Sequence, residues 1–270
     1  MPEGDTIHRL AAQLRGLLEG KPVVRVEVAR RATGGPRPPV PGTEIVAVDA
    51  VGKHLLIRFG DGTTLRTHLQ MNGRWDCYAE GESWRRPRHR MRALVAVPGF
   101  EAVCFDAPIA VLERAPAVGH LGPDLCRADV DLDEVLARLA RFVDDDAPLA
   151  DVLLDQRVGC GIGNVYKSEV CFAVGRHPAT PIRRLDDAAR REMFVVAATQ
   201  LQANLGGGPR TTVGPRPGAL AVYGRARRPC RRCGTPVEMS RIGAIPRTTY
   251  WCPVCQPLDP PAGPPSDAPG

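Results

Sequence analysis

The spacing of apolar residues predicts one amphipathic helix at the start of the chain. Apolar side chains recur at helical intervals at positions 7, 10, 11, 14, 17 and 18. Asp5 precedes this pattern and is a good helix N-cap, because its side chain can accept from free amides of the first turn. The sequence Gly20-Lys21-Pro22 then ends the helix.

Alternating apolar and polar residues predict strands over the next part of the chain. Val24, Val26 and Val28 alternate with charged residues, and a loop rich in Pro and Gly follows over 30–42. Further strands are expected over 45–48, 54–59, 63–69, 73–78, 91–97 and 102–106, with a hairpin turn at 60–62. The pattern predicts a β-sandwich or barrel of about 120 residues behind one helix.

Helical periodicity dominates the second half. Segments 132–143, 148–156, 164–172 and 185–205 predict helices, and Gly206-Gly207-Gly208-Pro209 ends the last of them. The fold class is therefore α+β, with an N-terminal helix and β-sandwich followed by a helical domain. From residue 257 onward Pro, Gly, Asp and Ser dominate, and we expect 257–270 to be a disordered tail.

The charge distribution points to a polyanionic partner. The formal net charge is +6 and the pI is near 9.0. Between residues 206 and 256 nine arginines face one acid, Glu238, which gives a local charge of +8. Such a patch is typical of a nucleic-acid binder, the alternative being a basic surface that only confers solubility.

Composition also bears on location and on the cysteines. The sequence contains no run of about 20 apolar residues, so it predicts no membrane span. The acidic N-terminus does not resemble a signal peptide. We expect a cytoplasmic protein in which thiols stay reduced. Five of the nine cysteines (77, 104, 126, 160 and 171) lie among apolar neighbours and are interpreted as buried thiols without chemistry.

The other four cysteines have the spacing of a zinc ribbon. Cys230-x2-Cys233 and Cys252-x2-Cys255 are 18 residues apart, so two knuckles can supply four thiolates to one tetrahedral ion. Four thiolates leave no open coordination position, which makes the predicted zinc structural. The residues between the knuckles are consistent with a β-hairpin, and Arg247 near its turn could contact a phosphate.

Three shorter features are ambiguous by themselves. If Met1 is removed, Pro2 offers a secondary amine that can attack a carbonyl, and Glu3 could move the protons; the alternative is an ordinary chain start. The turn 161–163 before Asn164 could bind phosphate at a helix N-terminus, or could be a common glycine-rich connection. Lys53 alone is indistinguishable from a solvated surface lysine.

Together these features resemble one family over residues 1–256, the bacterial formamidopyrimidine-DNA glycosylase and endonuclease VIII superfamily of DNA glycosylase/AP lyases. The resemblance rests on Pro2-Glu3-Gly4-Asp5-Thr6, Val51-Gly52-Lys53-His54-Leu55, Leu154-Asp155-Gln156 with Gly161-Ile162-Gly163-Asn164-Val165-Tyr166, Val222-Tyr223-Gly224-Arg225 and the segment from Arg247 to Gln256.

The resemblance implies a role for each matched residue. Pro2 would attack the anomeric carbon of a flipped-out damaged nucleotide, and Glu3 would protonate the opened sugar and shuttle protons during β,δ-elimination. Lys53 would contact phosphate and assist base loss. Asn164 and Arg247 would hold the flanking phosphates, and Lys167 and Arg225 are further expected DNA contacts.

Two departures indicate the endonuclease VIII branch. Relatives that act on oxidised purines carry an Arg-Arg-Phe-Gly segment where this chain has 104–109 without arginine, and a longer loop than 208–221 before Tyr-Gly-Arg. We therefore expect oxidised pyrimidines as substrates, with oxidised purines as the alternative. Gln70, Met71 and Asn72 would form the wedge that fills the gap left by the flipped base, unless Met71 packs in the core.

The sequence thus predicts a monomeric, cytoplasmic bacterial enzyme of base-excision repair, acting on damaged double-stranded DNA with the nucleoid. Its expected parts are a catalytic sandwich domain (1–122), a linker (123–131), a helix-two-turn-helix domain (132–222), a zinc finger (223–256) and the tail. Two rivals are a zinc-ribbon DNA-binding protein without catalysis, and a tautomerase that uses an N-terminal proline as a base.

Overall fold

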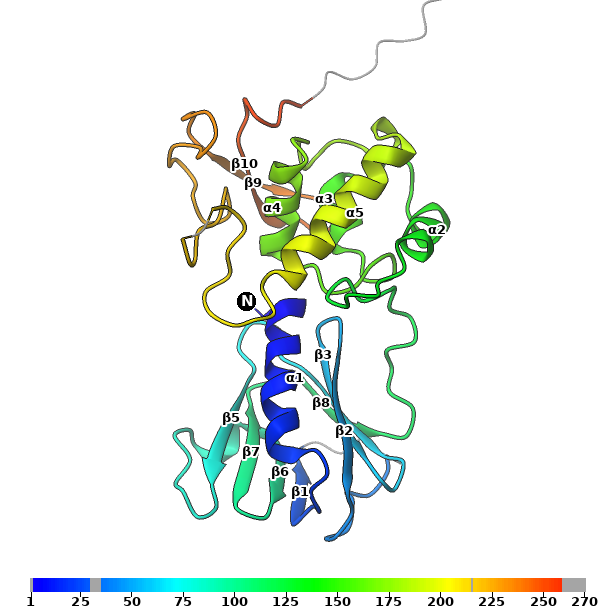
Figure 1. The fold of residues 1–270 in the computed structure, drawn as a ribbon, viewed down its shortest axis with the longest axis vertical. Helices are drawn as coiled ribbons and strands as arrows, with labels where there is room; N and C mark the ends of the chain where they lie inside the picture. The colour runs from blue at the N-terminus through cyan, green and yellow to red at the C-terminus, as the bar shows by residue number, and fades with distance from the viewer. Residues whose placement is uncertain (1, 30–34, 215, 259–270) are drawn as a thin grey trace, which may run out of the picture.

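The computed structural model describes residues 2–29, 35–214 and 216–258. Met1, residues 30–34 of the expected loop and residues 259–270 of the expected tail lie outside the described residues. A β-sandwich with one long helix forms one half of the protein, and helices with a small hairpin form the other (Figure 1).

The sandwich consists of two four-stranded antiparallel sheets. One has the order β1-β6-β7-β5, and the other has the order β2-β3-β4-β8. The strands of the first sheet are β1 (Arg25–Val28), β6 (Met91–Val97), β7 (Phe100–Phe105) and β5 (Arg74–Ala79). Those of the second are β2 (Ile45–Val51), β3 (His54–Phe59), β4 (Thr64–His68) and β8 (Ile109–Glu113).

Strand β8 is absent from the sequence prediction. Its five residues follow Ala107-Pro108, which interrupts the alternating pattern. The strand forms because β4 supplies a full ladder of partners, from Thr64 opposite Glu113 to His68 opposite Ile109. A pairing across more than 40 residues leaves no local signal in so short a segment.

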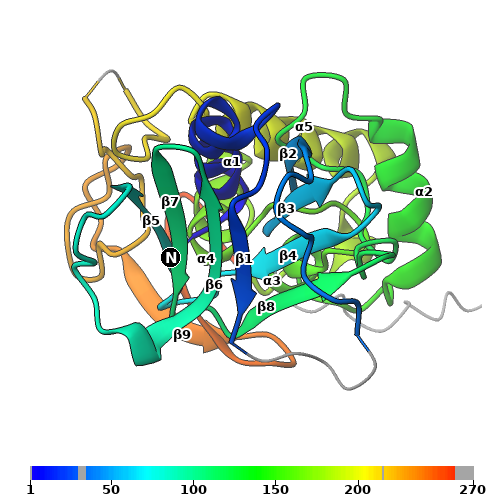
Figure 2. The ribbon, with the colours of Figure 1, turned by 90° about the horizontal axis from the view of Figure 1, so that it is seen from below.

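Helix α1 (Gly4–Leu18) closes the sandwich core, as its apolar spacing predicts. Its buried face, which includes Ile7, Leu14 and Leu18, joins the hydrophobic core shared by both sheets. Figure 2 shows α1 lying along the side where the two sheets diverge. The predicted N-cap is wrong: Glu3 occupies the cap position, and Asp5 lies within the first turn.

The helical half is built around a buried helix. It comprises α2 (Leu132–Phe142), α3 (Leu149–Leu154), α4 (Asn164–Ala173) and α5 (Asp187–Gln202), together with a 3-10 turn at Ile182–Arg184. A second 3-10 turn, Arg88–Arg90, belongs to the sandwich. Every residue of α4 from Val165 to Phe172 is buried. Helix α5 starts two residues later than predicted, because the Asp186 carboxylate accepts from Ala189 N at 2.8 Å and caps it.

The hairpin β9 (Glu238–Ile242) and β10 (Arg247–Trp251) packs beside α4. The segment leading to it is fixed by Glu169 of α4, whose buried carboxylate accepts from the amides of Ala221, Val222 and Tyr223 at 2.7–2.9 Å. The expected α+β class, with helix, sandwich, helical half and cysteine hairpin, is confirmed.

The two halves meet through hydrogen bonds to the buried Asp124. Its carboxylate accepts from Gly52 N at 2.7 Å and Cys126 N at 2.9 Å, and lies 2.9 Å from His8 Nε2. In addition, Gly4 N donates to Gly161 O at 2.9 Å. These contacts fix the start of α1 and the β2–β3 turn against the helical half. Among the described residues no helix has the length and apolar character needed to cross a membrane.

Candidate functional site

Glu3 lies at the junction of the two halves, against the first turn of α4. Its side chain is fully buried, and its carboxylate accepts from Gly163 N at 2.9 Å, Val165 N at 2.8 Å and Tyr166 N at 3.3 Å. These amides are the unpaired donors of a helix N-terminus, which favours a negative charge. Glu3 therefore caps a helix 160 residues away, and Pro2, half-buried, directly precedes it in the chain.

The glycine-rich turn before α4 accommodates this carboxylate. A side chain on Gly163 would collide with the Glu3 carboxyl group, although the backbone of Gly163 itself suits any residue. The sequence left two readings of the turn open, a phosphate site and a simple connection. The structure gives a third, because Glu3 occupies the backbone donors that a phosphate would use.

The environment of Glu3 favours its protonated form. Burial raises the pKa of the carboxyl group, and this outweighs the opposite effects of Arg210, the amide hydrogen bonds and Lys53. A carboxyl group with a raised pKa keeps its proton to a higher pH than an exposed carboxyl group does. That is the property required of a general acid–base residue.

Arg210 is a component of the site that the sequence did not single out. Its guanidinium donates to both carboxylate oxygens of Asp5, at 2.5 and 3.0 Å, lies 4.0 Å from the Glu3 carboxylate and stacks over the Tyr166 ring at 4.8 Å. Burial opposes its charge, but the Asp5 hydrogen bonds and the nearby carboxylates raise its pKa overall. One of the nine arginines in the basic segment is thus used inside the protein.

Lys53 forms the two-residue turn between β2 and β3 with Gly52. Gly52 has a φ of +56°, a side chain there would collide with Cys160, and its amide is held by Asp124. Burial lowers the pKa of the Lys53 ammonium, while the charge of Glu3 opposes the shift and that of Arg247 adds to it. Lys53 is therefore within electrostatic range of Glu3.

Two histidines next to Lys53 were missed by the sequence analysis. His54 and His68 are opposite each other on β3 and β4, with ring centroids 4.7 Å apart. Burial lowers the pKa of His54 to about 4, and burial together with Lys53 lowers that of His68, so both are neutral near pH 7. The buried His68 Nδ1 has no partner among the described residues. The position of His54 directly after Lys53 was the one available signal.

Asn164 and Lys167 connect the start of α4 to β10. Asn164 Nδ2 donates to Thr248 O at 2.7 Å, and Lys167 Nζ donates to Asn164 Oδ1 and Thr249 Oγ1, both at 2.7 Å, and to Thr248 O at 3.2 Å. Lys167 is fully buried, and its three protons are all used within the protein. This corrects the predicted direct contact of Lys167 with DNA; Asn164 is half-buried at the edge of the same cluster.

The two predicted DNA contacts of the C-terminal segment differ in their surroundings. Arg247 is exposed at the start of β10, next to the β9–β10 turn. Arg225 is half-buried and donates to the carbonyls of Ala221 and Pro229, the latter at 2.8 Å. The structure thus gives Arg225 a role in holding its own loop, while Arg247 is free to meet a ligand.

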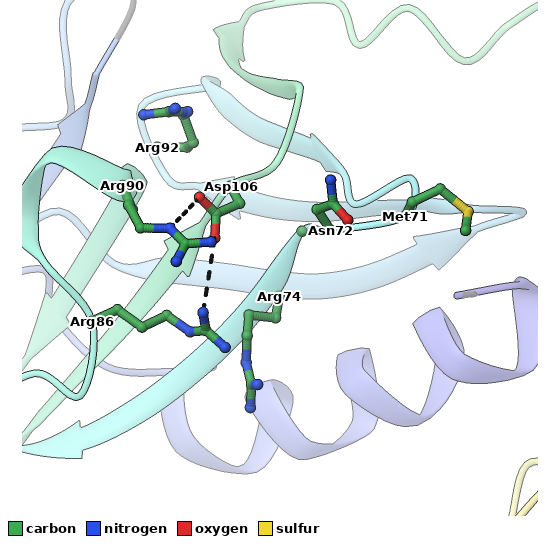
Figure 3. Close-up of a pocket in the computed structure, with 8 residues that line it drawn as sticks. Met71, Asn72, Arg74, Arg86, Arg90, Arg92 and Asp106 are labelled. Atoms are coloured by element: carbon green, nitrogen blue, oxygen red, sulfur yellow. Dashed lines mark hydrogen bonds and ion pairs between the residues drawn. The ribbon is translucent and has the colours of Figure 1, made fainter.

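The predicted wedge lies on the turn between β4 and β5. Gln70, Met71 and Asn72 are all exposed, Met71 to 66%, and Gln70 has a φ of +46°. Core packing of Met71, the alternative left open by the sequence, is therefore wrong. Figure 3 shows the Met71 side chain extending away from the neighbouring arginines.

The four ribbon cysteines form a cluster that fits a tetrahedral metal ion. Their Sγ atoms all lie within 4.8 Å of one another, with 3.9 Å between Cys230 and Cys255 and 3.4 Å between Cys233 and Cys252. A zinc–sulfur bond of about 2.3 Å puts tetrahedral sulfurs about 3.8 Å apart. The remaining five cysteines are buried or half-buried, and burial raises the pKa of each thiol.

The buried Lys167 predicts a measurable pH dependence of stability. Burial lowers its pKa to about 8, below its unfolded value near 10.5. Its contribution to stability is therefore fully present above pH 10.5 and is lost as the pH falls through 8. The free energy of unfolding of the wild type relative to Lys167→Met should rise by up to about 3 kcal/mol between pH 7 and pH 10.5.

Denaturant titrations of both proteins at the two pH values measure this difference. Lys21→Met, which removes a half-buried lysine of the sandwich, is the charge-matched control. An equal difference between the wild type and Lys167→Met at pH 7 and pH 10.5 would contradict the assigned surroundings of Lys167.

Comparison with known proteins gives a consistent result. The formamidopyrimidine-DNA glycosylase N-terminal domain family matches residues 1–107. The chain is 40% identical to probable endonuclease 8 2 of Streptomyces coelicolor, covering 95% of this chain and 94% of the relative. It is 43% identical to DNA-(apurinic or apyrimidinic site) lyase Nei2 of Mycolicibacterium smegmatis, covering 95% and 99%.

A solved structure extends the similarity to the whole fold. The formamidopyrimidine-DNA glycosylase of Lactococcus lactis, crystallised bound to DNA containing an AP site, superposes with a TM-score of 0.80 at 21% identity, covering 95% of this chain and all of that one. Together with the identity to the two endonuclease VIII-type relatives over nearly the full length, this leads to one conclusion. The chain belongs to the formamidopyrimidine-DNA glycosylase/endonuclease VIII superfamily, on its endonuclease VIII-like branch.

Proposed function

We propose that this protein is a bifunctional DNA glycosylase and AP lyase of base-excision repair. The observation that carries the proposal is the burial of Glu3 at the N-terminus of α4, which fixes Pro2 where the two halves meet. Membership of the superfamily and the AP lyase named among its relatives support the same reaction. The solved relative bound to AP-site DNA supports DNA as the partner.

Pro2 is the proposed nucleophile. Once Met1 is removed, its nitrogen is a secondary amine with a pKa of about 8, so a useful fraction is unprotonated near neutral pH. The nitrogen lone pair attacks C1′ of the flipped nucleotide, and the base leaves with the electrons of the glycosidic bond. The nitrogen then loses its proton, and its lone pair breaks the bond from C1′ to the ring oxygen, which gives an iminium ion between Pro2 and the opened deoxyribose.

Glu3 is the proposed proton carrier of this sequence. Its raised pKa allows the carboxyl group to protonate the ring oxygen as the sugar opens. The iminium ion acidifies the adjacent C2′ proton, whose removal expels the 3′ phosphate, and a second elimination expels the 5′ phosphate. The strand is cut without hydrolysis of a phosphate ester.

Cations around the pair would hold the DNA backbone. Lys53 lies within electrostatic range of both Glu3 and Arg247, and we infer that it contacts a phosphate near the lesion and assists base loss. Arg247, exposed on β10, and Asn164, at the start of α4, would hold the flanking phosphates. Because Asn164 donates to Thr248, the two would act as one clamp.

Oxidised pyrimidines are the proposed substrates. The segment that supplies an arginine in purine-specific relatives carries Asp106 here, and its carboxylate is bound to Arg90 at 2.7–2.8 Å. No side chain of 104–109 is a cation that could enter the gap left by a flipped base. We assign that task to Gln70, Met71 and Asn72, whose exposure suits a wedge.

A structural zinc ion is the proposed cofactor. Cys230, Cys233, Cys252 and Cys255 would hold it, and when bound it crosslinks the ends of the β9–β10 hairpin. The amides of Arg232 and Cys255 donate to Cys230 and Cys252 Sγ at 3.4 and 3.5 Å, as zinc knuckles do. The ion would thereby keep Arg247 in position.

Replacement of the nucleophile tests the proposal directly. The processed protein, incubated with an abasic-site duplex and borohydride, should form a covalent adduct, and Pro2→Gly should reduce its rate by about tenfold or more. An N-terminally extended chain, in which the Pro2 nitrogen is an amide, should form none. An undiminished adduct in Pro2→Gly would refute Pro2 as the nucleophile. No adduct with the processed wild type would refute the mechanism and favour a non-catalytic DNA-binding protein.

A single methyl group tests the placement of Glu3. Gly163→Ala should displace the Glu3 carboxylate and slow adduct formation by up to about 100-fold, because a small misplacement of catalytic groups is costly. Gly16→Ala, where the added methyl meets nothing within 4 Å, is the matched control and should behave as wild type. Wild-type kinetics in Gly163→Ala would mean that the position of Glu3 does not matter.

Metal removal tests the zinc finger. Elemental analysis should find one zinc ion per chain, and its chelation should unfold the hairpin and abolish DNA binding while the sandwich stays folded. Circular dichroism and a fluorescence binding assay follow the two effects. Tight DNA binding by the metal-free protein would overturn this assignment.

A further inference from the structure

An arginine-lined concavity lies beside the wedge turn, apart from Glu3 and Lys53. It has a volume of about 580 Å³ and opens to solvent. Four arginines, which we call the arginine site, contribute to its lining: Arg74, Arg86, Arg90 and Arg92. Figure 3 shows them grouped around Asp106, with Asn72 and Met71 at the border.

Two carboxylates hold these guanidinium groups in place. The Asp106 carboxylate accepts from Arg90 Nε at 2.8 Å and forms an ion pair with Arg90 Nη2 at 2.7 Å. It also lies 4.0 Å from Arg86 Nη1. The buried Asp76 accepts from Arg74 Nε at 3.0 Å and lies 3.5 Å from Arg86. The two acids therefore form a chain of alternating charges in which Arg86 is shared.

The arginine site has more positive charge than its partners neutralise. Arg92 donates to the backbone carbonyls of His89 and Met91 at 3.1 and 3.2 Å, and within the described parts of the chain no carboxylate pairs with it. Four guanidinium groups thus face two carboxylates. The Arg74 side chain is 54% exposed, so donors remain available to an anion. A purely structural ion-pair network would not need this excess.

The chain topology separates the arginine site from the proposed catalytic residues. Lys53 lies in the β2–β3 turn of the sheet β2-β3-β4-β8, whereas Arg74 starts β5 of the other sheet and Arg92 lies on β6. The turn that carries Met71 is the crossover between the two sheets. An object inserted along Met71 would therefore have Lys53 on one side and the arginines on the other.

We propose that the arginine site binds phosphates of the undamaged DNA strand, opposite the lesion. This inference rests on the proposed function and on the wedge turn. When the turn fills the gap in the duplex, the damaged strand faces Lys53, and the other strand lies on the arginine side. Guanidinium forks fixed by carboxylates suit the two free oxygens of a phosphodiester.

A double substitution removes Arg74 and Arg92, the two arginines of the site that do not pair with Asp106. Arg74→Ala/Arg92→Ala leaves the pairs of Arg86 and Arg90 with Asp106 intact. The control is Arg25→Ala/Arg58→Ala, which removes the same charge from an exposed and a half-buried arginine, both of them ion-paired. Arg25 is opposite Ala96 and Arg58 opposite Thr64, at the ends of the sheets away from the wedge turn.

Three duplexes with a stable abasic analogue distinguish the strands. The first has natural linkages, the second has uncharged methylphosphonate linkages flanking the nucleotide opposite the lesion, and the third has them in the damaged strand. The double variant should bind the first duplex roughly tenfold more weakly than wild type, with a salt slope smaller by about 2. The control variant should bind it as wild type does.

Non-additivity identifies the contacted strand. Neutral linkages opposite the lesion should weaken wild-type binding but have little further effect on the double variant. Neutral linkages in the damaged strand should weaken DNA binding by the same factor in the wild type and in the double variant. The proposal is overturned if the double variant, folded with a wild-type circular dichroism spectrum, binds the first duplex normally, or if non-additivity occurs with the damaged strand. Should the variant fail to fold, indifference of the wild type to neutral linkages opposite the lesion overturns it.

Borohydride trapping separates this proposal from the proposed function. At protein concentrations that saturate a duplex with a natural abasic site and natural linkages, the double variant should form the covalent adduct at the wild-type rate. If neither protein forms an adduct, the catalytic mechanism fails, and the binding experiments still decide the role of the arginine site. If both form it and affinity is unchanged, only the arginine site is refuted.

Discussion

The buried carboxylate of Glu3 accepts amide hydrogens from the first turn of α4 and joins the start of the chain to a helix 160 residues away. A carboxylate without these donors could not be buried there, since burial of an unpaired charge is strongly unfavourable. The same contact fixes Pro2 at the junction of the two halves. This interaction positions the proposed nucleophile and, together with the hydrogen bonds of Asp124, holds the two halves against each other. It also requires the absence of a side chain at Gly163.

Positively charged side chains lie near this carboxylate, but they do not cancel the rise of its pKa that burial causes. Arg210 is directed mainly at Asp5, and Lys53 approaches from the β2–β3 turn that Asp124 holds. The net result is a raised pKa for Glu3 and a lowered pKa for Lys53, so each group is less firmly charged than it would be in water. The site thus combines a proton carrier with cations for the DNA backbone, and the exposed wedge turn and arginine site extend the binding surface across the sandwich.

Local patterns predicted much of this arrangement and failed where partners are distant in sequence. Helical spacing located α1 and most later helices, and cysteine spacing located the metal cluster. Asp is a residue type that often caps helices, but the Asp5 carboxylate instead pairs with Arg210, which is 205 residues away. No local pattern could predict that pair. Lys167 lies on a helix whose residues from Val165 to Phe172 are all buried, and only the packing of β10 shows that Lys167 is among them. The sequence located the glycine-rich turn before α4, but it did not predict that the Glu3 carboxylate accepts from the amides there.

Identification of the residue that carries the sugar adduct tests the central claim most directly. The borohydride-reduced complex can be digested with trypsin and sequenced by tandem mass spectrometry, with an intact-mass measurement to establish removal of Met1. Our account predicts that the deoxyribose remnant is attached to the N-terminal nitrogen of the peptide from Pro2 to Arg9. A remnant on Lys53 or on any other side chain would contradict it.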